Sequence, residues 1–322
     1  MINSTEYQEM EVEFANGEIN LAGTLLQPSS SSPVPAVVLI HGAGPEKRNG
    51  SGNMLRDAAV QFASHGIAAL IYDKRGNGAS GGDWTKADFD DLADDASSGI
   101  KYLQAWPVIN PSRVGVWGFS QGGFIAPLVA ARSSAAAFTI IVSGAAVTPE
   151  QQELARVAQH MRADNFSEDD ILEAVEAMRQ VNACARTGLG WENLNVRYEA
   201  AVNRKVGWLP YLGGPLAPKG HWYWTWWRQV MDFDPLLACK QIKSPVLILL
   251  GELDCTVPVI ESISLYKEAI GSSKNPNFVI KVFPRANHGL RLARTGGHSE
   301  YGGTQEYVQG YFEKMIEWIL QL

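Results

Sequence analysis

The chain alternates short apolar runs with longer amphipathic stretches, and this alternation constrains its fold more than any other feature. Runs such as Ala36–Ile40 and Val246–Leu250 are apolar throughout, as expected of strands that are buried on both faces of a parallel sheet. Helical patterns separate the runs, which is typical of βαβ units. The sequence therefore predicts an α/β fold in which helices flank a mostly parallel central sheet.

The expected elements can be placed along most of the chain. Strands are expected at residues 10–14, 19–26, 36–40, 67–72, 114–117, 138–142, 245–250 and 278–283. The first two strands should form a hairpin that turns at Asn16-Gly17. Helices are expected at residues 54–65, 87–106 and 121–132, and a last one from about Thr304 to Leu320.

The alternation stops after the sixth strand. Between Thr148 and Pro235 helix signals prevail, including an N-cap at Thr148 followed by Pro149, and acidic residues directly after Ser167. We therefore expect an α/β core at residues 1–148 and 236–322, with a helical cap at residues 149–235 inserted after the sixth core strand.

Composition narrows the range of functions. A net charge of −7 argues against binding to nucleic acid or to an anionic membrane, because both need a basic surface. The apolar runs are far shorter than the roughly 20 residues that span a bilayer, and the acidic N-terminal stretch has no secretory-signal pattern. Cys184, Cys239 and Cys255 match no metal-binding spacing and are expected to be reduced. These features indicate a cytoplasmic protein without a metal or cofactor.

A candidate nucleophile lies in a G-x-S-x-G pattern at residues 118–122, with Ser120 at its centre. The pattern directly follows one expected strand and directly precedes a helix, which is the context of a serine held on a sharp strand-to-helix turn. A side chain two positions before or after the serine would collide in so tight a turn, and this explains Gly118 and Gly122. The turn would place the Ser120 hydroxyl at a helix N-terminus, where partial positive charge favours a developing anion.

A serine nucleophile needs a base within hydrogen-bond reach and an acid that orients the base. Asp254 follows the seventh strand and is the expected acid, while Glu252 in the same loop is the alternative. His288 follows the last strand and is the expected base, while His298, ten residues later, is its rival. Four further histidines, at positions 41, 65, 160 and 221, precede the serine or lie in the insertion.

Acyl transfer also needs two hydrogen-bond donors aimed at the oxygen that becomes negative. One is expected to be the backbone N–H of Gln121, directly after the serine. The other should come from the loop after the third strand, which reads His41-Gly-Ala-Gly-Pro45. Its small residues allow the backbone to approach a substrate, and we favour the N–H of Ala43, with Gly44 as the alternative.

Five motifs together resemble the α/β-hydrolase superfamily in order and spacing, and they cover the core but not the insertion. The tract at residues 41–45 is similar to the bacterial carboxylesterase and dienelactone-hydrolase-like branch. Dienelactone hydrolases proper use a cysteine nucleophile, so Ser120 argues against that exact activity. The motifs are His41-Gly42, the D-x-R-G-x-G-x-S segment from Asp73 to Ser80, the serine turn, Gly251-x-x-Asp254-x-x-Val257-Pro258 and Asn287-His288-Gly289.

The resemblance also implies roles outside the three candidate catalytic residues. The D-x-R-G-x-G-x-S segment is structural in the family, so Asp73, Arg75 and Ser80 are expected to brace the oxyanion loop. A helical insertion in this position resembles a cap over the active site. Four tryptophans of the insertion are candidate substrate-binding residues, and they could equally attach the cap to the core: Trp222, Trp224, Trp226 and Trp227.

The sequence thus predicts a serine hydrolase that cleaves carboxylic esters through an acyl-enzyme intermediate. Its substrate would be a small-molecule ester with a bulky apolar or aromatic portion. A thioesterase or small-peptide amidase that uses the same three residues is the second hypothesis. A ligand-binding protein that keeps the fold without the chemistry is the third. The natural substrate and the oligomeric state are left open by the sequence.

Overall fold

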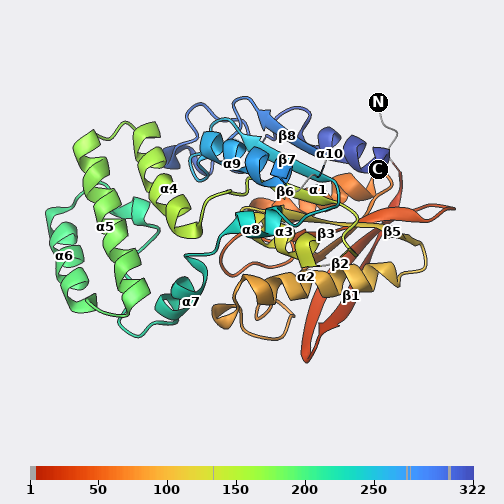
Figure 1. The fold of residues 1–322 in the computed structure, drawn as a ribbon, viewed down its shortest axis with the longest axis horizontal. Coiled ribbons are helices and arrows are strands. Elements are labelled where there is room, and N and C mark those ends of the chain that lie inside the picture. Colours follow the sequence, from red (N-terminus) through yellow and green to blue (C-terminus); the bar gives the residue numbers. More distant parts are fainter. Residues whose placement is uncertain (1–4, 133, 273–274, 276, 304–305) are drawn as a thin grey trace.

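The computed structural model describes residues 5–132, 134–272, 275, 277–303 and 306–322. Within them, one sheet has the strand order β1-β2-β4-β3-β5-β6-β7-β8 (Figure 1). β1 is antiparallel to β2, and β2 is antiparallel to β4, whereas all other neighbours are parallel, as predicted. The strands are β1 (Tyr7–Asn16), β2 (Ile19–Pro28), β3 (Val34–Ile40), β4 (Ala68–Tyr72), β5 (Ile109–Phe119), β6 (Thr139–Val142), β7 (Val246–Gly251) and β8 (Phe278–Phe283).

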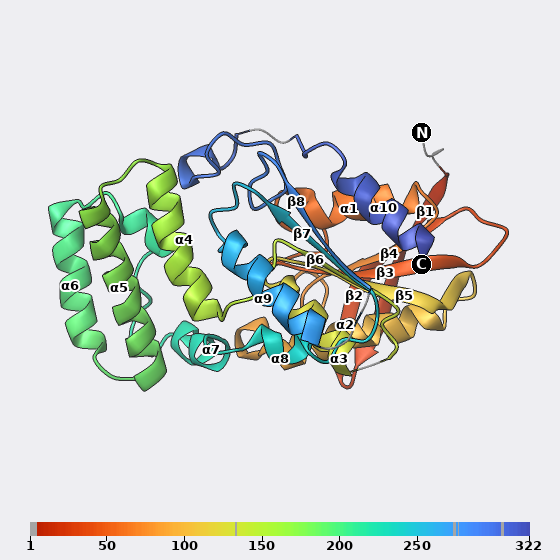
Figure 2. The ribbon, with the colours of Figure 1, turned by 45° about the horizontal axis from the view of Figure 1, so that its top comes forward.

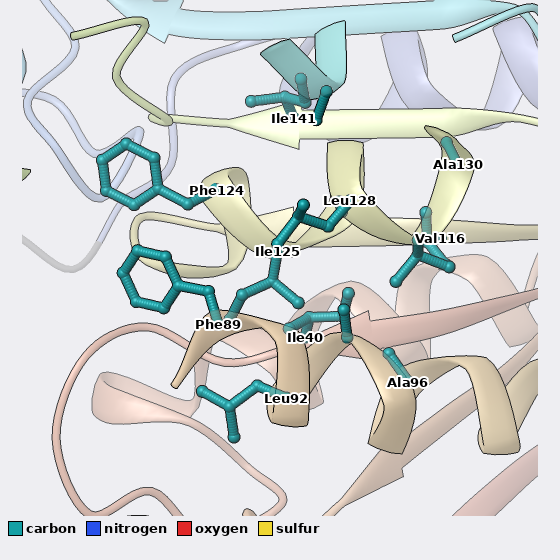
Figure 3. Close-up of a cluster of buried hydrophobic side chains, with 14 of the residues drawn as sticks. Ile40, Phe89, Leu92, Ala96, Val116, Phe124, Ile125, Leu128, Ala130 and Ile141 are labelled. Carbon is teal, nitrogen blue, oxygen red and sulfur yellow. The ribbon is translucent and has the colours of Figure 1, made fainter. Parts of the chain in front are cut away.

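Helices cover both faces of this sheet (Figure 2). Every residue of β3 is buried, and its side chains alternate between two apolar clusters, with Val38 in one and Val37 in the other. The first cluster, part of which Figure 3 shows, includes side chains of α2 (Phe89–Gln104), α3 (Gly122–Arg132) and α9 (Val259–Ser272). The second includes side chains of α1 (Met54–Ala63) and α10 (Tyr311–Gln321).

The last helix begins later than the sequence predicted. α10 starts at Tyr311, because Tyr307 instead lies in a short extended segment that bridges to Arg291. Thr304, where the helix was expected to begin, lies outside the described residues. The structure also has a helix, α9, between β7 and β8, where none was predicted.

A helical segment separates β6 from β7. It contains α4 (Pro149–Ala163), α5 (Glu168–Thr187), α6 (Trp191–Arg204), α7 (Trp222–Val230) and α8 (Pro235–Cys239). The Thr148 and Ser167 side chains cap α4 and α5 by accepting hydrogen bonds from Gln151 N and Asp170 N. Figures 1 and 2 show α4, α5 and α6 to one side of the sheet, and a separate apolar cluster joins α4 to α5.

The start of α4 lies beside the end of α7. The backbone N–H of Glu150 donates to the carbonyl oxygen of Met231 at 3.0 Å. The Arg186 guanidinium adds ion pairs to both Glu150 and Asp232.

Among the described helices, none is long and apolar enough to cross a membrane.

Candidate active site

Four loops that carry predicted site residues leave the same edge of the sheet. They follow β3, β5, β7 and β8, which belong to the parallel part of the sheet. The carboxyl ends of parallel strands lie together, and this is where α/β proteins place their ligands. The loops carry Ala43, Ser120, Asp254 and His288 respectively.

Ser120 lies on a strained turn between β5 and α3. Its φ of +53° is in the left-handed region that side chains rarely adopt. A Cβ on Gly118 would lie 2.0 Å from the carbonyl oxygen of Gly122, and a Cβ on Gly122 would lie 2.6 Å from that of Ile40. Only glycine therefore allows this turn. The Ser120 N–H donates to Val142 O of the neighbouring strand at 2.9 Å, which holds the turn in place.

Ser120, His288 and Asp254 form a chain of hydrogen bonds. The distance from Ser120 Oγ to His288 Nε2 is 2.9 Å, and that from His288 Nδ1 to Asp254 Oδ2 is 2.8 Å. The other carboxylate oxygen of Asp254 accepts from the N–H groups of Thr256 and Val257 at 2.8 and 2.9 Å. A carboxylate can only accept, so Nδ1 carries the imidazole proton. This leaves Nε2 free to accept the proton of the Ser120 hydroxyl.

Gly251 brings the loops of Asp254 and His288 together. It is the last residue of β7, and a Cβ on it would lie 2.4 Å from the carbonyl oxygen of Ala286. The backbone of Leu253 donates to this same oxygen at 2.8 Å. The close approach of the two backbones places the histidine ring beside the carboxylate.

The two rival residues lie elsewhere. Glu252 is exposed, and its carboxylate accepts a hydrogen bond from the backbone of Arg285. The ring of His298 packs among the rings of His160, Tyr211 and Tyr301. Neither side chain is bonded to His288 or Ser120 among the described contacts.

The two predicted oxyanion donors flank the serine. Ala43 and Gln121 line the same cavity as Ser120. Within the described part of the chain, neither backbone N–H donates to another group. Both N–H groups are therefore available to donate to a bound ligand, as the prediction of an oxyanion hole requires.

Asp73, in the segment after β4, holds the loop that carries Ala43, as expected. The Asp73 carboxylate accepts from the backbone and side chain of Arg48, which lies further along that loop. Burial alone would raise the pKa of Asp73, but hydrogen bonds from Arg48 and Ala79 bring the pKa below its usual value. The Ser80 hydroxyl donates to Asp73 O and accepts from the backbone of β2.

Arg75 differs from the expectation that it braces the oxyanion loop. Its guanidinium donates two hydrogen bonds to the Asp95 carboxylate at 2.7 and 2.8 Å and a third to Asp91 O. Both acceptors lie on α2, and the pair with Asp95 is buried. Arg75 therefore attaches the segment after β4 to α2.

Lys74 is a buried site residue that the sequence analysis missed. Its Nζ donates to the carbonyl oxygens of Gly42 and Gly44 at 2.6 and 2.8 Å, and to Gln121 Oε1 at 3.3 Å. Its burial lowers the pKa of the ammonium group to about 7, although nearby Glu46 opposes this shift. A lysine after a strand has no pattern that indicates such a position.

A cavity of about 240 Å³ adjoins Ser120. Core and insertion both contribute to its wall, and most of the side chains are apolar or aromatic. Trp226 and Trp227, two of the four tryptophans proposed to bind substrate, are among them. Three aromatic residues that the sequence analysis did not assign to the site also line it: Phe89, Phe124 and Tyr223.

Trp222 and Trp224 do not line this cavity but a neighbouring one of about 360 Å³. The reason is helical geometry, because successive side chains of α7 point about 100° apart around the helix axis. Trp224 is buried and donates through its indole to Pro218 O at 2.9 Å. Trp222 is 37% exposed and packs edge-on against Trp84.

Within the described residues, no cluster of three or more His, Cys, Asp or Glu side chains is positioned to hold a metal ion. The groups that the fold brings together are the serine turn, the hydrogen-bonded histidine and carboxylate, and the two backbone N–H groups.

The sheet order, the serine turn and the positions of the following loops define an α/β-hydrolase fold. An esterase of Pyrococcus furiosus, Pf2001, has the same fold, with a TM-score of 0.60 at 17% identity over 98% of this chain and 91% of the esterase. Within this class the chain belongs to the S15 family, because the family model described as X-Pro dipeptidyl-peptidase matches residues 16–281.

The relatives include proteins with more than one named activity. Esterase EstD of Thermotoga maritima is 26% identical over 290 residues, which is 89% of this chain but only 61% of EstD. Acyltransferase drtE of Aspergillus calidoustus is 24% identical over 277 residues, or 84% of this chain and 85% of drtE. Esterase and acyltransferase names share acyl transfer as their chemistry.

Proposed function

We propose that this protein is a serine esterase that cleaves carboxylic esters through an acyl-enzyme intermediate. The observation that carries the proposal is the hydrogen-bonded chain from Ser120 through His288 to Asp254, with distances of 2.9 and 2.8 Å. Named esterases among the relatives and structural neighbours support the same reaction.

In the proposed reaction, Ser120 Oγ attacks the ester carbonyl carbon while His288 Nε2 accepts the hydroxyl proton. Asp254 keeps the imidazole in the tautomer that can accept this proton and stabilises the positive ring that forms. The N–H groups of Ala43 and Gln121 bind the oxygen that becomes negative. Collapse of the tetrahedral intermediate passes the proton from His288 to the leaving alcohol. Water then attacks the acyl-enzyme by the same route and releases the acid.

The cavity beside Ser120 favours an ester with a compact apolar or aromatic group. Apolar cavities of about 150 Å³ hold benzene, so 240 Å³ accommodates a substituted ring. Glu153 is the only charged side chain among the described lining residues, and its carboxylate is paired with Arg156 at 2.8 Å. A paired carboxylate is poorly suited to binding the free amino group of a peptide, so we place esters ahead of X-Pro peptides.

Two experiments test this proposal. A fluorophosphonate probe should label wild-type protein at Ser120, and Ser120→Ala should abolish labelling. The same substitution should lower kcat for an activated aryl ester by about 10⁴- to 10⁶-fold, because the three residues act as a unit. Circular dichroism would show that the variant is folded. Activity within tenfold of wild type would exclude Ser120 as the nucleophile, and absent labelling of wild type would favour a silent binding protein.

Bond preference requires a separate comparison. An ester, a thioester and an anilide with the same acyl group should be compared by kcat/KM, together with an X-Pro anilide. The proposal requires the ester to be the best substrate. A higher kcat/KM for the thioester or for either anilide would replace it with the thioesterase or amidase alternative.

A further inference from the structure

Lys74 contacts both parts of the oxyanion site without facing the substrate cavity. Its ammonium group has three N–H donors and finds three acceptors: the carbonyl oxygens of Gly42 and Gly44 and the side-chain oxygen of Gln121. The residue is only 3% exposed. It reaches this position because β4 and β3 are parallel neighbours, so the segment after β4 lies beside the loop after β3.

We propose that Lys74 is a positioning residue for the oxyanion hole, which it orients and to which it supplies positive charge. This inference rests on the proposed esterase function. It assigns a role to the one residue between Asp73 and Arg75, both of which have other partners.

The orientation follows from the geometry of a peptide group. In a trans peptide the C=O and N–H bonds point in opposite directions. Gly42 O and Ala43 N–H belong to the same peptide, and Lys74 Nζ lies 2.6 Å from the oxygen. The N–H of Ala43 must therefore point away from Lys74. The bond to Gly44 O holds the next turn of the loop, and the bond to Gln121 ties it to the residue that provides the other donor.

The charge acts on the transition state more than on the bound ester. An ammonium group on the carbonyl oxygen polarises the peptide and strengthens its N–H as a donor. The stronger donor stabilises a neutral ester carbonyl only slightly, whereas it stabilises the oxyanion of the tetrahedral intermediate more. Removal of the charge should therefore lower kcat more than it raises KM.

The pKa of Lys74 makes this role sensitive to pH. Burial brings the pKa to about 7, so the group is charged below that pH and neutral above it. A neutral amine has two donors for three acceptors and directs its lone pair at an oxygen. Two titratable groups lie near Lys74. Glu46 raises the pKa of Lys74. The second group is His41, and burial together with the charge of Lys74 lowers the pKa of this histidine to about 3. Asp73 is bound to Arg48.

The decisive experiment compares wild type, Lys74→Met and the control Lys101→Met between pH 5.5 and 9.5. Methionine keeps most of the apolar stem and removes the amine, while Lys101 is an exposed residue near the end of α2. We expect Lys74→Met to lower kcat by about 10- to 100-fold with KM changed by less than about threefold, since loss of a whole oxyanion donor typically costs about 10²- to 10³-fold. As the pH rises, wild type and Lys101→Met should lose activity with a midpoint near pH 7. Lys74→Met should lack this step.

A second variant covers the case in which Lys74→Met does not fold. Lys74→Arg carries a charge that does not titrate in this range, so the step near pH 7 should disappear. A kcat within threefold of wild type in folded Lys74→Met, or a step near pH 7 that persists in either folded Lys74 variant, would overturn the inference. Fluorophosphonate labelling separates the two proposals: labelled, active wild type without a step near pH 7 contradicts only the role of Lys74, and unlabelled wild type contradicts both.

Discussion

Asp254 and Glu252 lie two residues apart in one loop but occupy different environments. Asp254 is buried, with both carboxylate oxygens bonded to His288 or to backbone N–H groups. Glu252 is exposed and bonded to the backbone of Arg285. Side-chain direction along the loop, and not the residue type, decides which carboxylate reaches His288.

This difference predicts unequal effects of two isosteric substitutions. Asp254→Asn should lower kcat by about 10³- to 10⁴-fold, because an amide that donates to Nδ1 holds the wrong imidazole tautomer. Glu252→Gln should change kcat less than about threefold. Steady-state kinetics on one aryl ester measures both. Equal losses, or the larger loss in Glu252→Gln, would reverse the assignment of the acid.

The site residues differ in how far the sequence reveals them. Ser120 is recognisable because its turn needs glycines at fixed positions on either side, which is a local requirement. Asp254 and His288 follow from chain order and from the strands before them. Lys74 is not recognisable, because its burial depends on a loop some thirty residues earlier that only the sheet brings beside it.

At the scale of elements, the short helix α7 places its aromatic rings in two different surroundings. Trp226 is half-buried and lines the cavity at Ser120, whereas Trp224 is buried against Pro218 and faces a different cavity. The amino-acid sequence requires that such closely spaced rings point in different directions. It could not show which ring faces the serine, since that depends on how the helix is rotated against the core.

The rotation of α7 predicts two distinct variants. Trp226→Ala should raise KM for bulky aryl esters more than for acetate esters and leave stability within about 1 kcal/mol, because the ring is half-exposed at a cavity. Trp224→Ala should lower the free energy of unfolding by about 3 kcal/mol and leave the ranking of esters unchanged. Urea titrations and an ester panel measure both. An unchanged ester ranking in Trp226→Ala would show that this ring does not contribute to substrate selection.

Strands were easier to predict than helices. The buried strands are short apolar runs, and the expected sheet matches the observed one to within a few residues at most ends. α9 was missed although Val259, Ile263, Tyr266 and Ile270 recur at helical spacing. The start of α10 was misplaced because Tyr307 bridges to Arg291, and no local pattern indicates this tertiary contact.

At the scale of the whole molecule, His160 joins the insertion to the core. Its Nε2 lies 3.3 Å from Thr256 Oγ1 and 3.2 Å from Tyr301 OH, and Thr256 N donates to Asp254. Burial, with a smaller contribution from Arg156, lowers the pKa of His160 to about 4. The folded protein therefore favours the neutral ring.

This buried histidine predicts a loss of stability in acid. Between pH 6.5 and 4 the unfolded chain binds the proton that folded His160 refuses, so stability falls as pH falls through that window. At pH 4.5 the lowered pKa of His160 reduces the free energy of unfolding by about 2 kcal/mol. His160→Gln should reduce the difference between the free energies of unfolding at pH 7 and pH 4.5 by about this amount. If wild type and His160→Gln lost the same free energy of unfolding between pH 7 and pH 4.5, His160 would not be the cause of the acid sensitivity.

The hydrogen bond between Glu150 and Met231 has a consequence for the history of the chain. It holds the start of α4 beside the end of α7, so the chain between them leaves and returns at neighbouring points. Joining such points with another segment costs little conformational entropy, whatever the length of the replacement. Lineages could therefore exchange the segment that forms much of the cavity wall while inheriting Ser120, Asp254 and His288 unchanged.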